Sequence, residues 1–221
     1  FIGITNLNEG TLKYAKTEET EEFIKGKINV NNTAALELNL NKSEIIGGNI
    51  YGTGIINKTG TETWIIRGDN SVFSGTTIIN EGEANFEKTA QNTYLGGTTT
   101  INAGGELQYI TTTSDKINGT INGAGTFKKY GTNTLTLSGN NSNFTGHAHL
   151  YEGYTSFTKT ENSAYLGGQT TINENGTLIY NTTTEDTING TINGSGTFIK
   201  TGENTLTLTG NNKNFSGAAY I

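Results

Sequence analysis

The chain has 221 residues, with 31 Gly, no Pro, Cys or Met, and a formal net charge of −6. Lack of cysteine excludes a disulfide scaffold and a thiolate metal site. A single arginine, Arg67, with no basic cluster excludes nucleic acid as a partner, because nothing would neutralise a phosphate backbone. Thr and Ile favour strands, while Gly and Asn suit tight turns, so the composition predicts an all-β fold of many short strands.

One unit of 71 residues occurs three times. The sequence GTNTLTLSGNN at 131–141 returns as GENTLTLTGNN at 202–212, and more loosely at 60–70. The repeats are set at 1–72, 73–143 and 144–214, with the start of a fourth at 215–221. Because the chain begins and ends partway through the pattern, residues 1–221 are expected to be a single segment of a longer repetitive protein.

A shorter period lies inside each unit. An aliphatic residue followed by a polar residue, most often Asn, appears first at Leu7, Val30 and Ile50 and recurs in steps of about 20 to 29 residues. Such steps are about the length of one coil of a solenoid, whose coils bond only to their neighbours. The sequence therefore predicts a right-handed parallel β-helix of about nine coils. The longest step of each unit, ending in Gly-Asp-Asn or Gly-Asn-Asn, is expected to hold a hairpin or an enlarged loop.

Strand alternation predicts which side chains point inward. The expected core columns, one residue from each repeat, are Leu36, Leu107 and Leu178; Leu38, Tyr109 and Tyr180; Tyr14, Phe86 and Phe157; Ile56, Phe127 and Phe198; Trp64, Leu135 and Leu206; and Ile66, Leu137 and Leu208. A structural ladder of stacked amides is expected at one corner, formed by Asn8, Asn31, Asn80, Asn102, Asn122, Asn173 and Asn193.

Paired carboxylates would indicate catalysis, since some β-helices cleave polysaccharides with paired acids. Asp115 and Asp186 are repeat equivalents three coils apart, too far for a dyad, and Asp69 has Asn140 and Asn211 as counterparts in a turn. A run of acids, Glu18, Glu19, Glu21 and Glu22, is interpreted as a solvated loop, with a weak cation site as the alternative. No catalytic residue and no cofactor is predicted.

The two histidines, His147 and His149, have the i, i+2 spacing that points both rings outward from one strand. Their expected neighbours are Asn118 and Thr120 on one side and Gln169 and Thr171 on the other, none of them a good transition-metal ligand. No metal site is predicted. A bland surface is the leading interpretation, and an exposed contact patch of His147, His149 and Tyr220 is the alternative.

Two further sets of residues recur at positions expected to face outward. Threonines at 98, 100, 120, 171 and 191 suggest ice binding, but other residue types interrupt the array. Lys58, Lys129 and Lys200 recur in register and are interpreted as separate surface charges that maintain solubility.

The repeat unit contains a motif that resembles one of a known family. Residues 123–146, GAGTFKKYGTNTLTLSGNNSNFTG, resemble the autotransporter-associated β-strand repeat of type V secreted passenger domains. Residues 194–217 fit equally well, and 52–75 are degenerate at Trp64 and Arg67. The Asn, Ile, Thr and Lys bias also resembles very large fusobacterial passengers that serve in adhesion and co-aggregation.

The resemblance implies an extracellular passenger at the bacterial cell surface or outer membrane, either attached or released. Attachment to the membrane would occur only through a C-terminal barrel outside this sequence. The predicted function is a non-enzymatic adhesin or stalk segment and a virulence factor. Its expected partners are a host cell-surface glycan or protein receptor, or other bacterial cells. The alternatives are self-association in aggregation or biofilm, and a polysaccharide-degrading β-helix enzyme.

Overall fold

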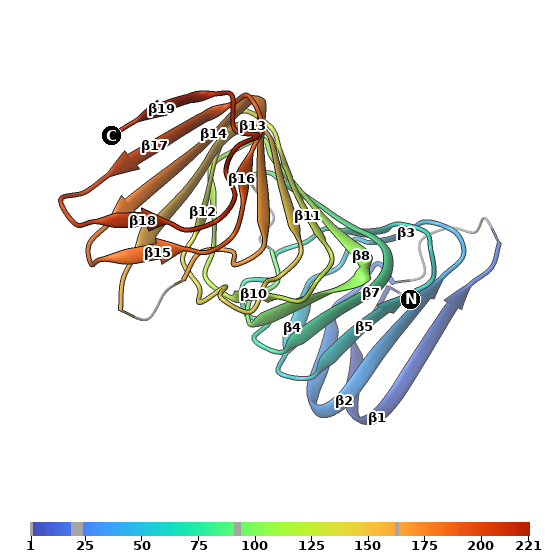
Figure 1. Cartoon of the computed structure of the whole chain (residues 1–221). Helices are drawn as coiled ribbons and strands as arrows, with labels where there is room; N and C mark the ends of the chain where they lie inside the picture. Colours follow the sequence, from blue (N-terminus) through green and yellow to red (C-terminus); the bar gives the residue numbers. More distant parts are fainter. Residues whose placement is uncertain (1, 19–23, 91–93, 162–163) are drawn as a thin grey trace.

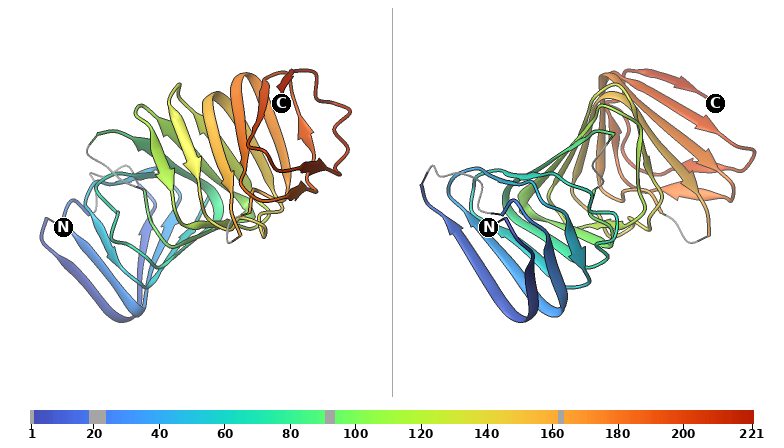
Figure 2. Two further views of the ribbon diagram at one scale, coloured as in Figure 1. Left: turned by 90° about the vertical axis from the view of Figure 1, so that its left-hand side faces the viewer. Right: turned by 180° about the vertical axis from the view of Figure 1, so that it is seen from behind.

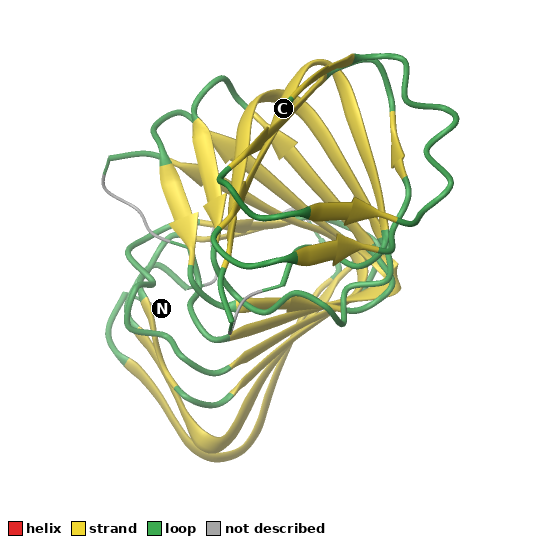
Figure 3. Ribbon diagram, turned by 60° about the vertical axis from the view of Figure 1, so that its left-hand side comes forward, coloured by secondary structure: helices red, strands yellow, loops and turns green. Residues whose placement is uncertain are grey.

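The computed structural model describes all residues except 1, 19–23, 91–93 and 162–163, and its regular elements are strands (Figures 1 and 3). No helix long and apolar enough to cross a membrane occurs in the part of the chain that the structure describes. All recorded strand pairings are parallel and join one coil to the next. The predicted all-β parallel β-helix of about nine coils is confirmed.

Long strands come in three pairs, one pair in each repeat. They are β1 (Thr5–Lys16) and β2 (Ile28–Leu40), β7 (Thr76–Lys88) and β8 (Thr98–Thr111), and β13 (His147–Lys159) and β14 (Gln169–Thr182). The first strand of each pair bends at a glycine with positive φ, at Gly10, Gly82 and Gly153. The pairing register shifts beside each bend, as in a β-bulge.

Shorter strands complete the coils. Those of five residues are β5 (Ile55–Thr59), β11 (Thr126–Tyr130) and β17 (Thr197–Thr201). The remaining strands are β3 (Glu44–Ile46), β4 (Ile50–Gly52), β6 (Trp64–Ile66), β9 (Asp115–Ile117), β10 (Thr120–Asn122), β12 (Thr134–Leu137), β15 (Asp186–Ile188), β16 (Ile192–Asn193), β18 (Leu206–Leu208) and β19 (Ala218–Tyr220).

The core lies inside the coils, and the predicted inward columns are confirmed. Leu36, Leu107 and Leu178 are each 0 % exposed, and most members of the other columns are buried as well. The exceptions lie in the first and last coils: Tyr14 and Leu206 are partly buried and Leu208 is exposed. These side chains have the same inward orientation but are covered by a neighbouring coil on one side only.

Three coils of the solenoid contain fewer residues than one sequence repeat, so equivalent residues of successive repeats are not stacked on each other. The in-register series Thr11, Ala35, Ile55 and Thr76 shows that three coils use about 65 residues, fewer than the 71 of one repeat. Each repeat is therefore displaced by about six residues along the coil, more than a quarter of its circumference. The bends of β1 and β2 accordingly project on a different side of the stack from those of β13 and β14 (Figures 1 and 2).

The predicted hairpin or enlarged loop in the longest step is wrong. Residues 52–75 form an ordinary coil, in which β5 and β6 pair in parallel with the strands of adjacent coils. The step looked long because its two ends are not stacked on each other: Ile79 lies in register with Lys58, not with Ile50.

The Gly-Asn-Asn segment holds neighbouring coils together. The backbone N–H of Ile121 donates to Oδ1 of Asn141, which is 1 % exposed, at 2.7 Å. Asn70 and Asn212 accept the N–H of Ile50 and Ile192 in the same way. Because this side-chain amide accepts a hydrogen bond from a buried backbone N–H of the adjacent coil, it stabilises the stacking of the two coils.

Glycines also allow the coils to approach each other. A Cβ placed on Gly119 would lie 1.9 Å from the carbonyl oxygen of Gly97, and one on Gly97 would lie 2.1 Å from that of Gly75. Gly54 and Gly139 continue this column across adjacent coils. Side chains are thus excluded at this corner by the neighbouring backbone.

Candidate binding surface

An aromatic cluster lies on the outer face of β11 and β13. The rings of Tyr130 and Tyr151 are stacked with centroids 4.5 Å apart and an interplanar angle of 4°. His149 lies 5.7 Å from Tyr151, and the rings of His147 and His149 are 3.8 Å apart. We call these four side chains the aromatic cluster. Aromatic pairs of this kind form a rigid contact surface.

The neighbours of the two histidines differ in part from those predicted. Gln169 and Thr171 flank them as expected, and His147 Nε2 lies 2.8 Å from Thr171 Oγ1. On the other side they are in register with Thr126 and Lys128, so the prediction of Asn118 and Thr120 is wrong. The reason is the displacement of each repeat by about six residues along the coil.

The electrostatics of the cluster favour neutral histidines. Burial lowers the pKa of His147 and His149, and for His149 the nearby His147 and Lys128 lower it further. Lys128 Nζ forms an ion pair with Glu106 at 2.7 Å, which balances its charge. Among the described residues no group of three His, Cys, Asp or Glu side chains is placed to hold a metal ion.

Tyr220 lies apart from the histidines. It is 60 % exposed on β19 and in register with Ile199, whereas the coils stacked on His149 present Thr171 and Asn193. The structure therefore brings together two members of the predicted contact patch but not the third.

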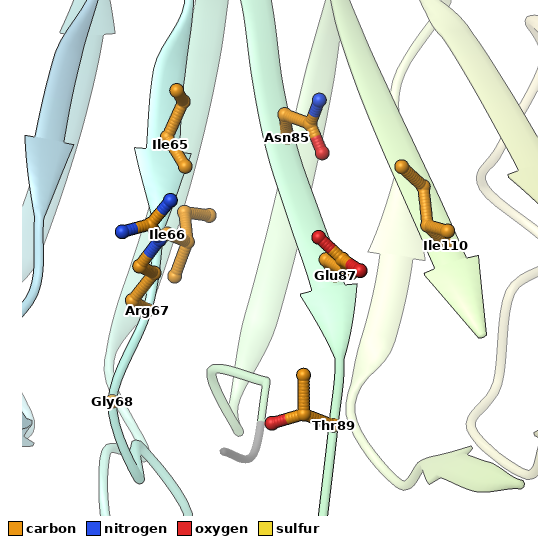
Figure 4. A pocket seen from close by; sticks show the side chains of 8 residues that line it. All are labelled: Ile65, Ile66, Arg67, Gly68, Asn85, Glu87, Thr89 and Ile110. Carbon is orange, nitrogen blue, oxygen red and sulfur yellow. The ribbon is translucent and has the colours of Figure 1, made fainter. Parts of the chain in front are cut away.

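An open groove of about 380 Å³ crosses β6, β7 and β8, and we call it the arginine groove (Figure 4). Ile65 and Arg67 lie along β6 and its end, Asn85 and Glu87 along β7, and Ile110 on β8. The sequence analysis noted Arg67 as the single arginine and as a departure from the repeat pattern, but not as part of a site. That departure, Arg where the other repeats have Ser138 and Thr209, was the available signal.

The aspartates are tied into the structure. Tyr109 donates to Asp115 and Tyr180 to Asp186, each at 2.5 Å between oxygen atoms. Lys88 and Lys159 lie 3.9 and 3.6 Å from the same two carboxylates.

Asp69 caps a turn, as its alignment with Asn140 predicted. Its Oδ1 accepts the N–H of Ser71 at 3.1 Å, and Asn140 accepts that of Ser142 at 3.3 Å. Of the predicted acidic loop, Glu18 is exposed, and Glu19, Glu21 and Glu22 lie outside the described residues.

Sequence reasoning missed one pair of carboxylates. Glu83 and Glu106 are in register on adjacent strands of the outer face. Burial raises the pKa of Glu83, and the charge of Glu106 raises it further. The alternation of β7 and β8 indicated that both point outward, but only the coil register places them side by side.

The interpretation of the recurring lysines as surface charges is wrong for Lys58 and Lys129. Lys58 and Lys129 are 0 % exposed. Lys129 Nζ donates to the carbonyl oxygens of Gly131, Asn133 and Glu152. These lysines point inward because they stand two residues after Ile56 and Phe127 on the same strands, and backbone carbonyls satisfy the ammonium groups.

Lys58 is held by the carbonyl oxygens of Thr59, Gly60 and Glu81. Burial lowers the pKa of both Lys58 and Lys129 to about 8. Lys200, near the last coil, is half-buried and donates to Gly202.

Part of the predicted asparagine ladder is stacked. Asn31 Nδ2 donates to Asn8 Oδ1 at 2.7 Å, and Asn102 Nδ2 donates to Asn80 Oδ1 at the same distance. Asn80 donates in turn to Asn57, which the prediction did not include.

The other three predicted members lie elsewhere. Asn122 and Asn193 are in register with Thr100 and Thr171. Asn173 Nδ2 donates to the carbonyl oxygen of Leu150 at 3.4 Å. The amides therefore form short runs, because the rotation of the repeats separates equivalent corners.

Comparison with known proteins gives one family. Residues 56–83 and 198–221 match the passenger-associated-transport-repeat. Comparisons with curated proteins and with solved structures give no match. This repeat implies a secreted or surface-displayed passenger and suggests a structural role. Together with the parallel β-solenoid, the two matches support an autotransporter passenger domain.

Proposed function

We propose that the chain is a non-enzymatic adhesive stalk, displayed on the bacterial surface, that contacts host cells or other bacteria. A solenoid spans distance through contacts between neighbouring coils and needs no long-range core. The narrower resemblance to fusobacterial passengers that serve in adhesion and co-aggregation fits the same role.

The observation that carries this proposal is the contrast between the inside and the outside of the coils. Inward positions repeat closely, as at Leu36, Leu107 and Leu178, and all three are buried. Outward positions change from coil to coil, as at Ile110, Tyr130 and Tyr151. A uniform core thus supports an outer surface whose side chains vary along the solenoid. Such a molecule can recognise a partner on one face while its length holds that face away from the cell.

Beads coated with the purified chain test the proposal. We expect them to bind epithelial cells or a second bacterial species, and beads coated with an unrelated acidic protein of similar size to bind neither. Clumping of coated beads without any cell would favour self-association instead. Absence of both kinds of contact would contradict an adhesive role.

A second candidate function is glycan cleavage, favoured by the adjacent Glu83 and Glu106. Retaining glycosidases place two carboxyl groups ~5 to 5.5 Å apart, one protonated and one ionised. Glu83 has a raised pKa and Glu106 is paired with Lys128. Release of reducing sugars from cell-wall or host polysaccharides, lost in Glu83→Gln, would support this function over a purely structural one.

A further inference from the structure

We infer that the arginine groove and the aromatic cluster form one continuous surface, and that this surface binds an extended, uncharged glycan along the axis of the solenoid. The inference rests on the proposed adhesive function and names its partner. We call this surface the axial strip, and its two columns of outward side chains are defined below.

The first column joins the two sites coil by coil. Ile66 is in register with Phe86, which places Arg67 beside Glu87. Glu87 is in register with Ile110, and Ile110 with Tyr130, whose ring stacks on Tyr151. One outward side chain from each of five successive coils therefore connects the arginine groove to the aromatic cluster.

The second column runs beside the first. Asn85 is in register with Gln108, Gln108 with Lys128, and Lys128 with His149. At ~4.8 Å per strand the strip is about 19 Å long, and two columns i, i+2 apart make it roughly 7 Å wide. The strip is long and narrow.

These dimensions disfavour a folded protein partner. Two columns over five coils give a footprint on the order of 200 Å², whereas a standard protein interface covers about 800 Å² per partner. An extended peptide commonly binds a sheet by adding a strand to a free edge. The central strands of the strip, β7, β8 and β11, are paired on both sides, so they offer no such edge.

The charges of the strip disfavour an anionic partner. Arg67 lies beside Glu87, and Lys128 is bonded to Glu106. The histidines have lowered pKa values, so they are neutral near pH 7. The positive groups are therefore balanced, and the strip offers no field that would attract a polyanion.

The remaining chemistry fits a sugar chain. Planar polar groups, such as Asn85, Gln108 and His149, alternate with Ile110 and the stacked tyrosines. Tyrosine combines an apolar ring with a hydroxyl group that donates and accepts hydrogen bonds. Tyr130 and Tyr151 lie one coil apart and are partly exposed, and because they stack on each other, one face of each ring is covered by the other. A linear glycan offers hydroxyl groups and apolar C–H faces at a similar repeat.

The displacement of the repeats along the coil explains why the axial strip does not recur in each repeat. The positions equivalent to Tyr130 are Thr59 and Thr201, and those equivalent to Tyr151 include Asn80. These equivalents lie on other sides of the solenoid, so the strip is assembled from different positions of successive repeats. The other repeats also supply substitutions that the fold already accommodates.

The test compares three proteins: the 221-residue chain, the double variant Tyr130→Thr/Tyr151→Asn, and the control Tyr154→Thr. Tyr154 is 46 % exposed and lies on β13 outside the strip. Fluorescently labelled cellohexaose and chitohexaose are the neutral probes, and hyaluronan hexasaccharide is the anionic probe of equal length. Binding is measured by anisotropy, and the thermal unfolding curves of the three proteins establish that all are folded.

We expect at least one neutral hexasaccharide to bind the parent chain and Tyr154→Thr equally, and to bind the double variant at least tenfold more weakly. Three results would overturn the inference: no binding of either neutral probe, binding of hyaluronan alone, or equal binding by the double variant. A dimer seen by sedimentation and lost in the double variant would assign the strip to a second copy of the chain instead.

The inference and the proposed function can fail separately. If the double variant adheres to cells as strongly as the parent, the strip is not the adhesive surface while the adhesive function stands. If neutral probes bind through the strip but coated beads bind no cell, the glycan site stands and the adhesive function falls.

Discussion

Replacing the buried Lys129 with Met is expected to destabilise the chain far more than the same change at its neighbour Lys128. Both lysines lie on β11, but Lys129 is 0 % exposed while Lys128 points outward toward Glu106. Met conserves most of the aliphatic stem and removes the ammonium group. The pair therefore isolates the role of the buried charge.

The magnitude follows from the hydrogen bonds that are lost. Lys129→Met removes the donor to Gly131, Asn133 and Glu152. Thr111 Oγ1 also donates to Asn133 O, at 2.9 Å, and more weakly to Gly131 O, at 3.4 Å. These two carbonyl oxygens therefore keep a side-chain donor in the variant, whereas Glu152 O loses the donor that Lys129 provided. A hydrogen bond from a charged group contributes ~1.5 to 3 kcal/mol, so we expect a loss of about 2 to 4 kcal/mol. Lys128→Met removes a half-exposed ion pair worth ~0.2 to 1 kcal/mol.

Urea unfolding at pH 7, followed by circular dichroism and by the fluorescence of the single Trp64, measures both changes. A solenoid can depart from two-state unfolding, so the midpoints of both signals are compared. Equal midpoint shifts for Lys129→Met and Lys128→Met would refute the structural role of the buried ammonium.

The same pair predicts a pH dependence. Burial lowers the pKa of Lys129 to about 8, whereas an unfolded lysine titrates near 10.5. Between these values the unfolded chain binds more protons than the native chain, so the free energy of unfolding rises with pH in this window. We expect the difference between the parent and Lys129→Met to be larger at pH 9.5 than at pH 7. A difference that is constant or smaller at pH 9.5 would contradict the lowered pKa.

Three other substitutions test the fold, each by urea unfolding against a matched control. Gly119→Ala places a Cβ 1.9 Å from Gly97 O and forces adjacent coils apart, so we expect a loss of at least ~3 kcal/mol, against none for Gly3→Ala, where the space is open. Asn141→Ala leaves the N–H of Ile121 without its acceptor and should cost about 1 to 3 kcal/mol; the exposed Asn140→Ala should cost less than ~1 kcal/mol. Leu107→Asp buries a charge between Ala84 and Phe127 and should abolish the cooperative transition, whereas the half-exposed His147→Ala should shift stability by less than ~1 kcal/mol. Unfolding of Leu107→Asp at the parent's midpoint would contradict the assignment of that side chain to the core.

The fold class and the core could be predicted from the sequence because both depend on local patterns. Strand alternation and the 71-residue repeat were enough to place Leu107 and Phe127 inside the coils, and both are 0 % exposed. The same alternation points Lys129 inward, against the usual exposure of lysine. The carbonyl oxygens that make its burial possible come from a turn and from the next coil, which no local pattern reveals.

The candidate binding surface could be predicted only in part. His147 and His149 were expected on the outer face, but their stacking on Tyr151, and its stacking on Tyr130, were not. The spatial neighbours of these residues belong to other coils. If the predicted length of a coil is wrong by a few residues, every neighbour predicted from it is therefore wrong.

By itself, the sequence determined that the chain is a repeating all-β solenoid and which side chains fill it, because alternation and duplication can be recognised without knowing which coils are neighbours. Only the tertiary structure decided which coils lie in register. The number of residues in a closed coil depends on every bend and turn around it, including the bends at Gly82 and Gly153 and the close approach at Gly119. Three closed coils use about 65 residues, fewer than the 71 of the repeat. This difference displaces successive repeats and decides which outward side chains lie next to each other.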